Sequence, residues 1–210
     1  MRAMQHTQID RHIWEQALSQ GAVLRQIALT MGLLSGVLYV AATMIAAAGW
    51  PEYSAMSQTI SELSAIDAPS RPTMTSLMTA YSLLIMTFAF AVVVMARRRR
   101  VRIVGVMLLG YSILCVFGPL APMHMRGIPA SLTDSMHIAL TAATVVFIVL
   151  AIGFGAAAFG HRFRLYSIAS GLVILYFGGL SAMDGPRIAA NLPTPLLGLN
   201  ERISIFAFML

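Results

Sequence analysis

The sequence has little charge, no lysine and a single cysteine. Charged residues make up 10% of its 210 positions and hydrophobic ones 58%, and the mean hydropathy is +0.79. So few charges and such long apolar runs are typical of membrane proteins. Cys115 has no second cysteine to pair with, which excludes a disulfide within the chain and favours a small buried hydrophobe. No interleaved basic and aromatic surface lies outside the apolar runs, which argues against nucleic acid as a partner.

Five apolar runs are each long enough, or nearly so, to cross a bilayer. Backbone groups in hydrocarbon must be satisfied within their own segment, and the runs lack the alternation of barrel strands, so each should be a helix. The predicted fold is therefore an all-α, polytopic transmembrane helix bundle. The expected spans are Ile27 to Gly49, Thr73 to Ala96, Ile103 to Pro119, Met136 to Phe159 and Leu165 to Met183.

The two ends of the chain depart from this pattern. A sixth apolar stretch begins at "GLNERISIFAFML" and gives only about 12 Å of helix after Arg202, so we expect a sixth span that is truncated or incomplete. Residues 1–26 are polar and are predicted to form a cytoplasmic segment. They make either a helix lying in the membrane interface or a solvated leader. Residues 27–210 should form one transmembrane domain.

Small residues in the first run indicate close helix packing. Gly32 and Gly36 are four positions apart, the small-xxx-small register that lets helices approach closely. The partner is either another helix of the same chain or a second copy.

The arginines predict the orientation. Ten of them lie in the N-terminal segment, in "RRRRVR" and in "HRFR", against two acidic residues, whereas the other connections hold four arginines and six acidic residues. Cytoplasmic connections of membrane proteins carry the excess of basic residues, which puts the N-terminus and the two arginine-rich connections in the cytoplasm. We expect a multipass protein of the plasma membrane, the inner membrane of a bacterium.

The polar segment "SQTISELSAIDAPSRP", residues 57–72, would then lie outside. Its spacing predicts a short outer interfacial helix with Ser57, Ser61 and Ser64 on one side and apolar residues on the other. This helix is either an ordinary connection or a lid over an outward cavity.

The segment "SLTDSMH" opens the fourth run. Asp134 is placed to cap the helix, and it also shares a face with His137 three residues on, where a carboxylate can orient an imidazole. His124, between Met123 and Met125, offers soft ligands for copper, but two outer histidines make a poor zinc set. We therefore predict no metal and no cofactor.

Three short motifs resemble a known group of bacterial and archaeal multipass proteins, the domain of unknown function 998 family. They are Tyr53 followed by "ISEL" at residues 60–63, the histidine that opens the fourth run, His137, and "GLNERI" before the last. The resemblance implies six spans and no established reaction.

These observations predict an outward polar pocket. Its candidate residues are Ser61, Glu62, Asp134, His137, Asp184 and Arg202. A guanidinium facing hydrocarbon is costly, so Arg202 should turn inward to a carboxylate, with Glu62 as the first choice and Asp134 or Asp184 next.

The favoured function is a binding or accessory protein for a lipid head group or another membrane protein. A membrane-embedded metal-dependent hydrolase and a small-solute transporter are the alternatives, so the sequence leaves open whether the protein is an enzyme.

Overall fold

The chain folds into helices joined by short connections. The computed structural model describes residues 2–209, and their side chains from Gly21 onward. No β-strand occurs in this part of the chain. The elements are α1 (Arg2–Ala48), η1 (Ser61–Ser64), α2 (Arg71–Met95), α3 (Arg99–Phe117), η2 (Gly118–Leu120), α4 (Leu132–Ala158), α5 (His161–Met183), α6 (Gly185–Ala189) and α7 (Leu197–Met209).

Five helical segments are long and apolar enough to cross a membrane, which confirms the predicted polytopic bundle. They are Gly21–Ala48, Arg71–Met95, Arg99–Leu120, Leu132–Ala158 and His161–Ala189. The fourth span begins at Leu132, four residues before the predicted start at Met136. Ser131 caps it there, because its hydroxyl accepts from the backbone N–H of Thr133 and Asp134 bonds back to the Ser131 N–H.

The last described helix is shorter than a membrane span. α7 has 13 residues, about 20 Å at helical rise, while a span needs about 30 Å. At the other end, α1 continues from Arg2 into the first span without a break, so residues 2–26 and that span form one helix. The alternative of an interfacial helix rests on an apolar stripe of Ile9, Ile13, Trp14, Ala17, Leu18 and Leu24, and all of these side chains except that of Leu24 lie outside the described ones.

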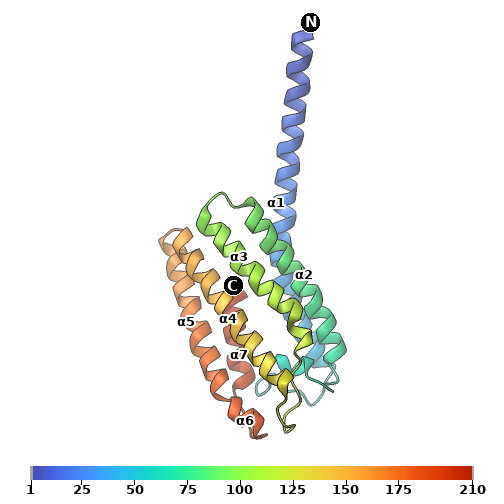
Figure 1. The fold of residues 1–210 in the computed structure, drawn as a ribbon, viewed down its shortest axis with the longest axis vertical. Helices are drawn as coiled ribbons and strands as arrows, with labels where there is room; N and C mark the ends of the chain where they lie inside the picture. Colours follow the sequence, from blue (N-terminus) through green and yellow to red (C-terminus); the bar gives the residue numbers. More distant parts are fainter. Residues whose placement is uncertain (1, 210) are drawn as a thin grey trace.

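The helices pack mainly against their neighbours in the sequence, from α1 to α5, and α7 packs against α5. In Figure 1 the N-terminal half of α1 projects from one end of the bundle, where the α2–α3 and α4–α5 connections also lie. The opposite end holds η1, the α3–α4 connection and α6. α7 starts at this second end and stops midway along the bundle. The predicted cytoplasmic and outer connections thus lie at opposite ends of the fold.

The segment from 57 to 72 does not form the predicted amphipathic α-helix. Before α2 begins at Arg71, only Ser61–Ser64 is helical, as one 3₁₀ turn, and the rest of the segment consists of turns and bends. Ile60 and Leu63 are buried under the bundle, but Met56, predicted to share their face, is exposed. The predicted separation of polar and apolar faces fails because the polar residue Glu62 is buried beside Leu63.

Candidate functional site

A buried ion pair lies at the end of the bundle that holds η1. Nε and Nη2 of Arg126 donate to Oε2 and Oε1 of Glu62, each at 2.7 Å, in the bidentate geometry that suits a guanidinium and a carboxylate. The Glu62 residue is 1% exposed. Such a charge persists out of water only when its oxygens are bonded, and Thr59 donates a backbone N–H at 2.9 Å and Gln58 an amide N–H at 3.2 Å.

Arg126 joins three connections that are far apart in the sequence. Besides Glu62, it donates to Oγ1 of Thr194 at 2.6 Å and to the carbonyl of Ser57 at 2.8 Å. The Thr194 hydroxyl donates to the same carbonyl at 2.8 Å. The connections after α1, before α4 and before α7 are therefore tied together through one guanidinium.

Arg202 turns inward, as predicted, but not to Glu62. It donates to the Tyr53 hydroxyl at 2.6 Å and to the backbone carbonyls of Ala55, Gln58 and Gly198 at 2.7, 3.2 and 3.0 Å. Among the described side chains, no carboxylate lies within ion-pair distance of it. The predicted Arg202–Glu62 pair is wrong because Arg126 already occupies both carboxylate oxygens. Gln58 links the two residues, because its carbonyl accepts from Arg202 and its side-chain amide donates to Glu62.

The Tyr53 side chain that accepts the hydrogen bond from Arg202 is a neutral phenol. Burial raises the pKa of its hydroxyl, so the proton is retained and is donated to the carbonyl of Thr59 at 2.9 Å. The Arg202 guanidinium carbon also lies 5.7 Å from the centre of the Tyr53 ring, a cation–π distance. The phenol thus satisfies two polar groups of the same segment.

The start of α7 lies directly on this segment. The carboxylate of Glu201 accepts from the backbone N–H of Ile60, and the N–H of Leu199 donates to the carbonyl of Met56 at 3.1 Å. Gly198 permits this approach, because a Cβ there would overlap the carbonyl oxygens of Ala55 and Gln58. We call residues 53–62, Arg126, Thr194 and residues 198–202 the outer latch.

His124 and His137 have separate partners. Asp134 pairs with His124, not with His137: it accepts from the His124 backbone N–H at 2.7 Å, and its Oδ2 lies 2.8 Å from Nδ1 of that ring. His137 lies with Nδ1 at 3.0 Å from the carbonyl of Ala121. The predicted capping role of Asp134 is confirmed, and the predicted carboxylate–imidazole contact forms with the other histidine. Among the side chains of residues 21–209, no three His, Cys, Asp or Glu gather closely enough to hold a metal ion.

Of the remaining candidates, Asp184 lies apart from these clusters, and Ser61 lies in the latch beside Glu62 with no side-chain bond to Arg126 or Arg202 among the described contacts. Asp184 pairs loosely with Arg187 at 3.7 Å, and the Ser61 carbonyl accepts from the hydroxyl of Ser64. Sequence reasoning missed Arg126 and Thr194. One signal pointed to Arg126: it is one of only four arginines predicted outside, where orientation does not explain a basic residue, so it needed a partner.

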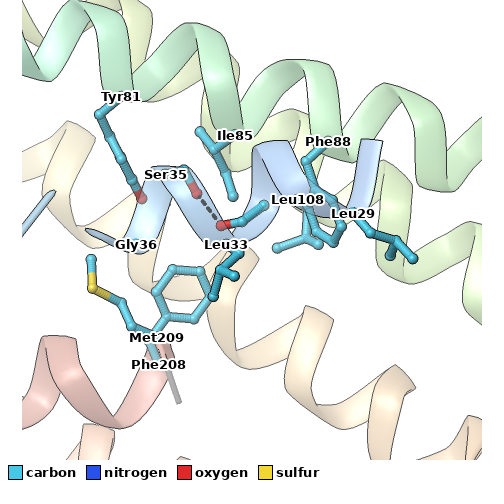
Figure 2. A pocket seen from close by; sticks show the side chains of 11 residues that line it. Leu29, Leu33, Ser35, Gly36, Tyr81, Ile85, Phe88, Leu108, Phe208 and Met209 are labelled. Carbon is cyan, nitrogen blue, oxygen red and sulfur yellow. Dashed lines mark hydrogen bonds between the residues drawn. The ribbon is translucent and has the colours of Figure 1, made fainter. Parts of the chain in front are cut away.

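A second feature lies between the spans. A groove of about 430 Å³ is lined by Leu29 and Leu33 of α1, Ile85 and Phe88 of α2, Leu108 of α3 and Phe208 of α7. Figure 2 shows these side chains around it, with Phe208 and Met209 closing one side from the end of α7. Leu29 and Leu33 are exposed, so the groove opens on the surface of the bundle.

The groove offers almost no unsatisfied polar group. The Ser35 hydroxyl donates to the carbonyl of Gly32 at 2.7 Å, the bond drawn in Figure 2. The Tyr81 hydroxyl lies 2.7 Å from that of Tyr111. Gly36 faces open space, since a Cβ added there would meet nothing within 4 Å. An apolar occupant fits this lining best.

Five apolar spans around a tyrosine-rich core define a multipass α-helical membrane protein. The chain matches the model of a family described as "Protein of unknown function (DUF998)" over residues 33–210, and it belongs to that family. The resemblance seen in its motifs is thereby confirmed. No curated protein and no solved structure matches the chain.

Proposed function

We propose that the protein is a binding protein of the plasma membrane that holds an acyl chain of a membrane lipid in the groove between α1, α2 and α3. The observation behind the proposal is the groove itself, about 430 Å³ with an apolar lining. Its walls belong to three of the candidate spans, so lipid is the solvent at its mouth. The hydroxyls of Ser35 and Tyr81, which line the groove, already have hydrogen-bond partners within the protein. They therefore do not require a polar ligand.

The end of α7 supports this proposal. Phe208 packs edge-on against Tyr111 with ring centres 5.3 Å apart, and it lines the groove below the core. Leu29 and Leu33 of α1 also line the groove and are exposed, so the space is irregular and opens on the surface of the bundle. A flexible hydrocarbon chain fills such an irregular space at little cost, because it needs no hydrogen-bond partner.

In this proposal the outer latch has a structural role. Glu62 and Arg202 are engaged by side chains and carbonyls of their own fold, which supports a closed outer end rather than an open polar pocket. The arginine distribution supports a cytoplasmic N-terminus, with the latch outside.

Filling the groove from within tests the proposal. Gly36→Leu places a side chain in the open space of the groove, and Gly153→Leu is the matched control, a mid-span glycine of α4 with equally open surroundings. Each protein is reconstituted with a phospholipid that carries a photoreactive diazirine in its acyl chain, and the crosslinked peptides are mapped by mass spectrometry. We expect crosslinks on the peptides with Leu29, Leu33 and Phe208, and a several-fold loss there in Gly36→Leu only. Equal crosslinking of those peptides in both variants would overturn the proposal.

A further inference from the structure

The end of the bundle opposite the latch carries seven arginines and no carboxylate on its two connections. The basic residues are Arg97 and Arg98 between α2 and α3, Arg99, Arg100 and Arg102 in the first turn of α3, and Arg162 and Arg164 in the first turn of α5. All seven are exposed, and none forms an ion pair with a described side chain. Orientation in the membrane requires basic residues here, but it does not require them to lie together.

The two connections form one surface. Arg100 of the first donates to the carbonyl of Ala157 at 2.6 Å, and Arg98 to that of Ala158 at 3.5 Å. Arg164 of the second donates to the carbonyl of Ala156 at 3.3 Å. Arginines from both sides therefore meet at the last turn of α4, and Figure 1 shows the two connections side by side.

Two helix N-termini add to the positive charge of this surface. α3 begins at Arg99 and α5 at His161, and neither has a side chain that caps its first amides. Each free N-terminus is equivalent to about half a positive charge. The C-terminus of α4, which would offset one of them, is already engaged by three guanidiniums. The guanidiniums of Arg99 and Arg162, beside the two N-termini, form no hydrogen bond with the described residues.

An aromatic surface borders the arginines. Phe159 and Phe163 stack edge-on with centres 4.9 Å apart, Tyr166 follows at 6.2 Å, and all three are exposed. Exposed aromatic rings beside basic residues are typical of the depth at which lipid head groups meet acyl chains. The surface is thus suited to an amphipathic anion.

We infer that this surface binds a phospholipid head group with two phosphates. Each phosphate would lie at one connection, Arg99 and the start of α3 receiving the first and Arg162 and the start of α5 the second. Two anionic groups on one molecule match two adjacent positive centres, and a lipid with one phosphate would leave one centre unfilled. This inference concerns the other end of the fold and does not depend on the groove.

The test compares lipids at equal charge. The protein is placed in phosphatidylcholine nanodiscs that contain either cardiolipin or twice the amount of phosphatidylglycerol, and bound lipid is counted by native mass spectrometry. We expect retention of cardiolipin well above that of phosphatidylglycerol. Arg99→Gln with Arg162→Gln should lower cardiolipin affinity by about 30-fold, at the usual contribution of an arginine near a charged surface. Equal retention of the two lipids, or an unchanged preference in this variant, would overturn the inference.

Two control variants test the position and the charge of these arginines. Arg71→Gln with Arg187→Gln removes the same charge at the latch end and should leave cardiolipin retention unchanged; a comparable loss there would point to net charge alone and overturn the inference. Arg99→Lys with Arg162→Lys preserves the charge and should retain part of the preference for cardiolipin. Such partial retention would show that the loss in the glutamine variant does not come from misfolding.

Inorganic pyrophosphate is added to lipid-free protein as the soluble probe, and stabilisation equal to that by cardiolipin would assign the surface to a free phosphate compound instead of a lipid.

Discussion

Arg126 and Glu62 form a bidentate ion pair between residues 64 positions apart, with both bonds at 2.7 Å. The Glu62 side chain is buried and that of Arg126 is 16% exposed, and neither residue belongs to a candidate membrane span. It joins the connection after the first span to the connection before the fourth. A buried pair of this kind adds little stability over an apolar replacement, but removing one partner leaves an uncompensated charge.

Arg126→Met should therefore lower the free energy of unfolding by about 3–5 kcal/mol, because Glu62 would be left buried and unpaired. Arg126→Lys should recover only part of this loss, since an ammonium cannot make the two parallel bonds. Chemical unfolding in mixed micelles measures both variants. Arg187→Ala is the control, because its contact with Asp184 is long and half exposed, and we expect a change within about 1 kcal/mol. A loss no larger for Arg126→Met than for this control would contradict the assignment.

Gly198→Ala should destabilise the protein by about 1–3 kcal/mol, since its methyl group would overlap two backbone carbonyls and push α7 off the segment beneath it. Gly179→Ala, in open surroundings on α5, should be neutral or stabilising by up to about 1 kcal/mol. Thermal unfolding in detergent compares the two. If both variants unfold at the same temperature, α7 does not lie as close to residues 55–58 as described.

Tyr53→Phe should cost about 1–2 kcal/mol, because the hydroxyl that accepts from Arg202 and donates to Thr59 is lost. Tyr176→Phe is the matched change on an exposed tyrosine of α5 and should stay within about 0.5 kcal/mol. The same unfolding experiment applies. The phenol has no role in holding α7 if the two substitutions have equal effects.

Reporter fusions test the orientation. A reporter placed after Arg100 or Arg164 should register in the cytoplasm, and one placed near Asp67 or Arg126 should register outside, because ten of the 14 arginines lie on the first side. An outside signal at Arg100 would invert the whole arrangement, with the latch then facing the cytoplasm.

Elemental analysis of the detergent-purified protein tests the hydrolase alternative. We expect no stoichiometric zinc or copper, since His124 is paired with Asp134 while His137 lies against a backbone carbonyl. One zinc ion per chain, lost in His137→Ala but kept in His161→Ala at the other end, would instead favour the hydrolase.

The sequence by itself determined the class of fold, the number of complete spans and the separation of the arginine-rich connections from the acidic ones. These follow from local rules. A backbone in hydrocarbon must bond within its own helix, so a long apolar run such as that of α4 can only be a helix. The cap at Ser131 and Asp134 was also readable, because both partners lie within one turn.

Only the tertiary structure decided which charged and polar groups meet. Arg202 had several outer carboxylates within conceivable reach, and it bonds instead to Tyr53 and three carbonyls. Glu62 forms its ion pair with Arg126, and Asp134 contacts the ring of His124 rather than that of His137. The groove beside Gly36 could not be predicted from the sequence either, since residues of four helices line it. The physical reason is that such contacts depend on the path of each connection, and residue spacing fixes geometry only within a few turns of a single helix.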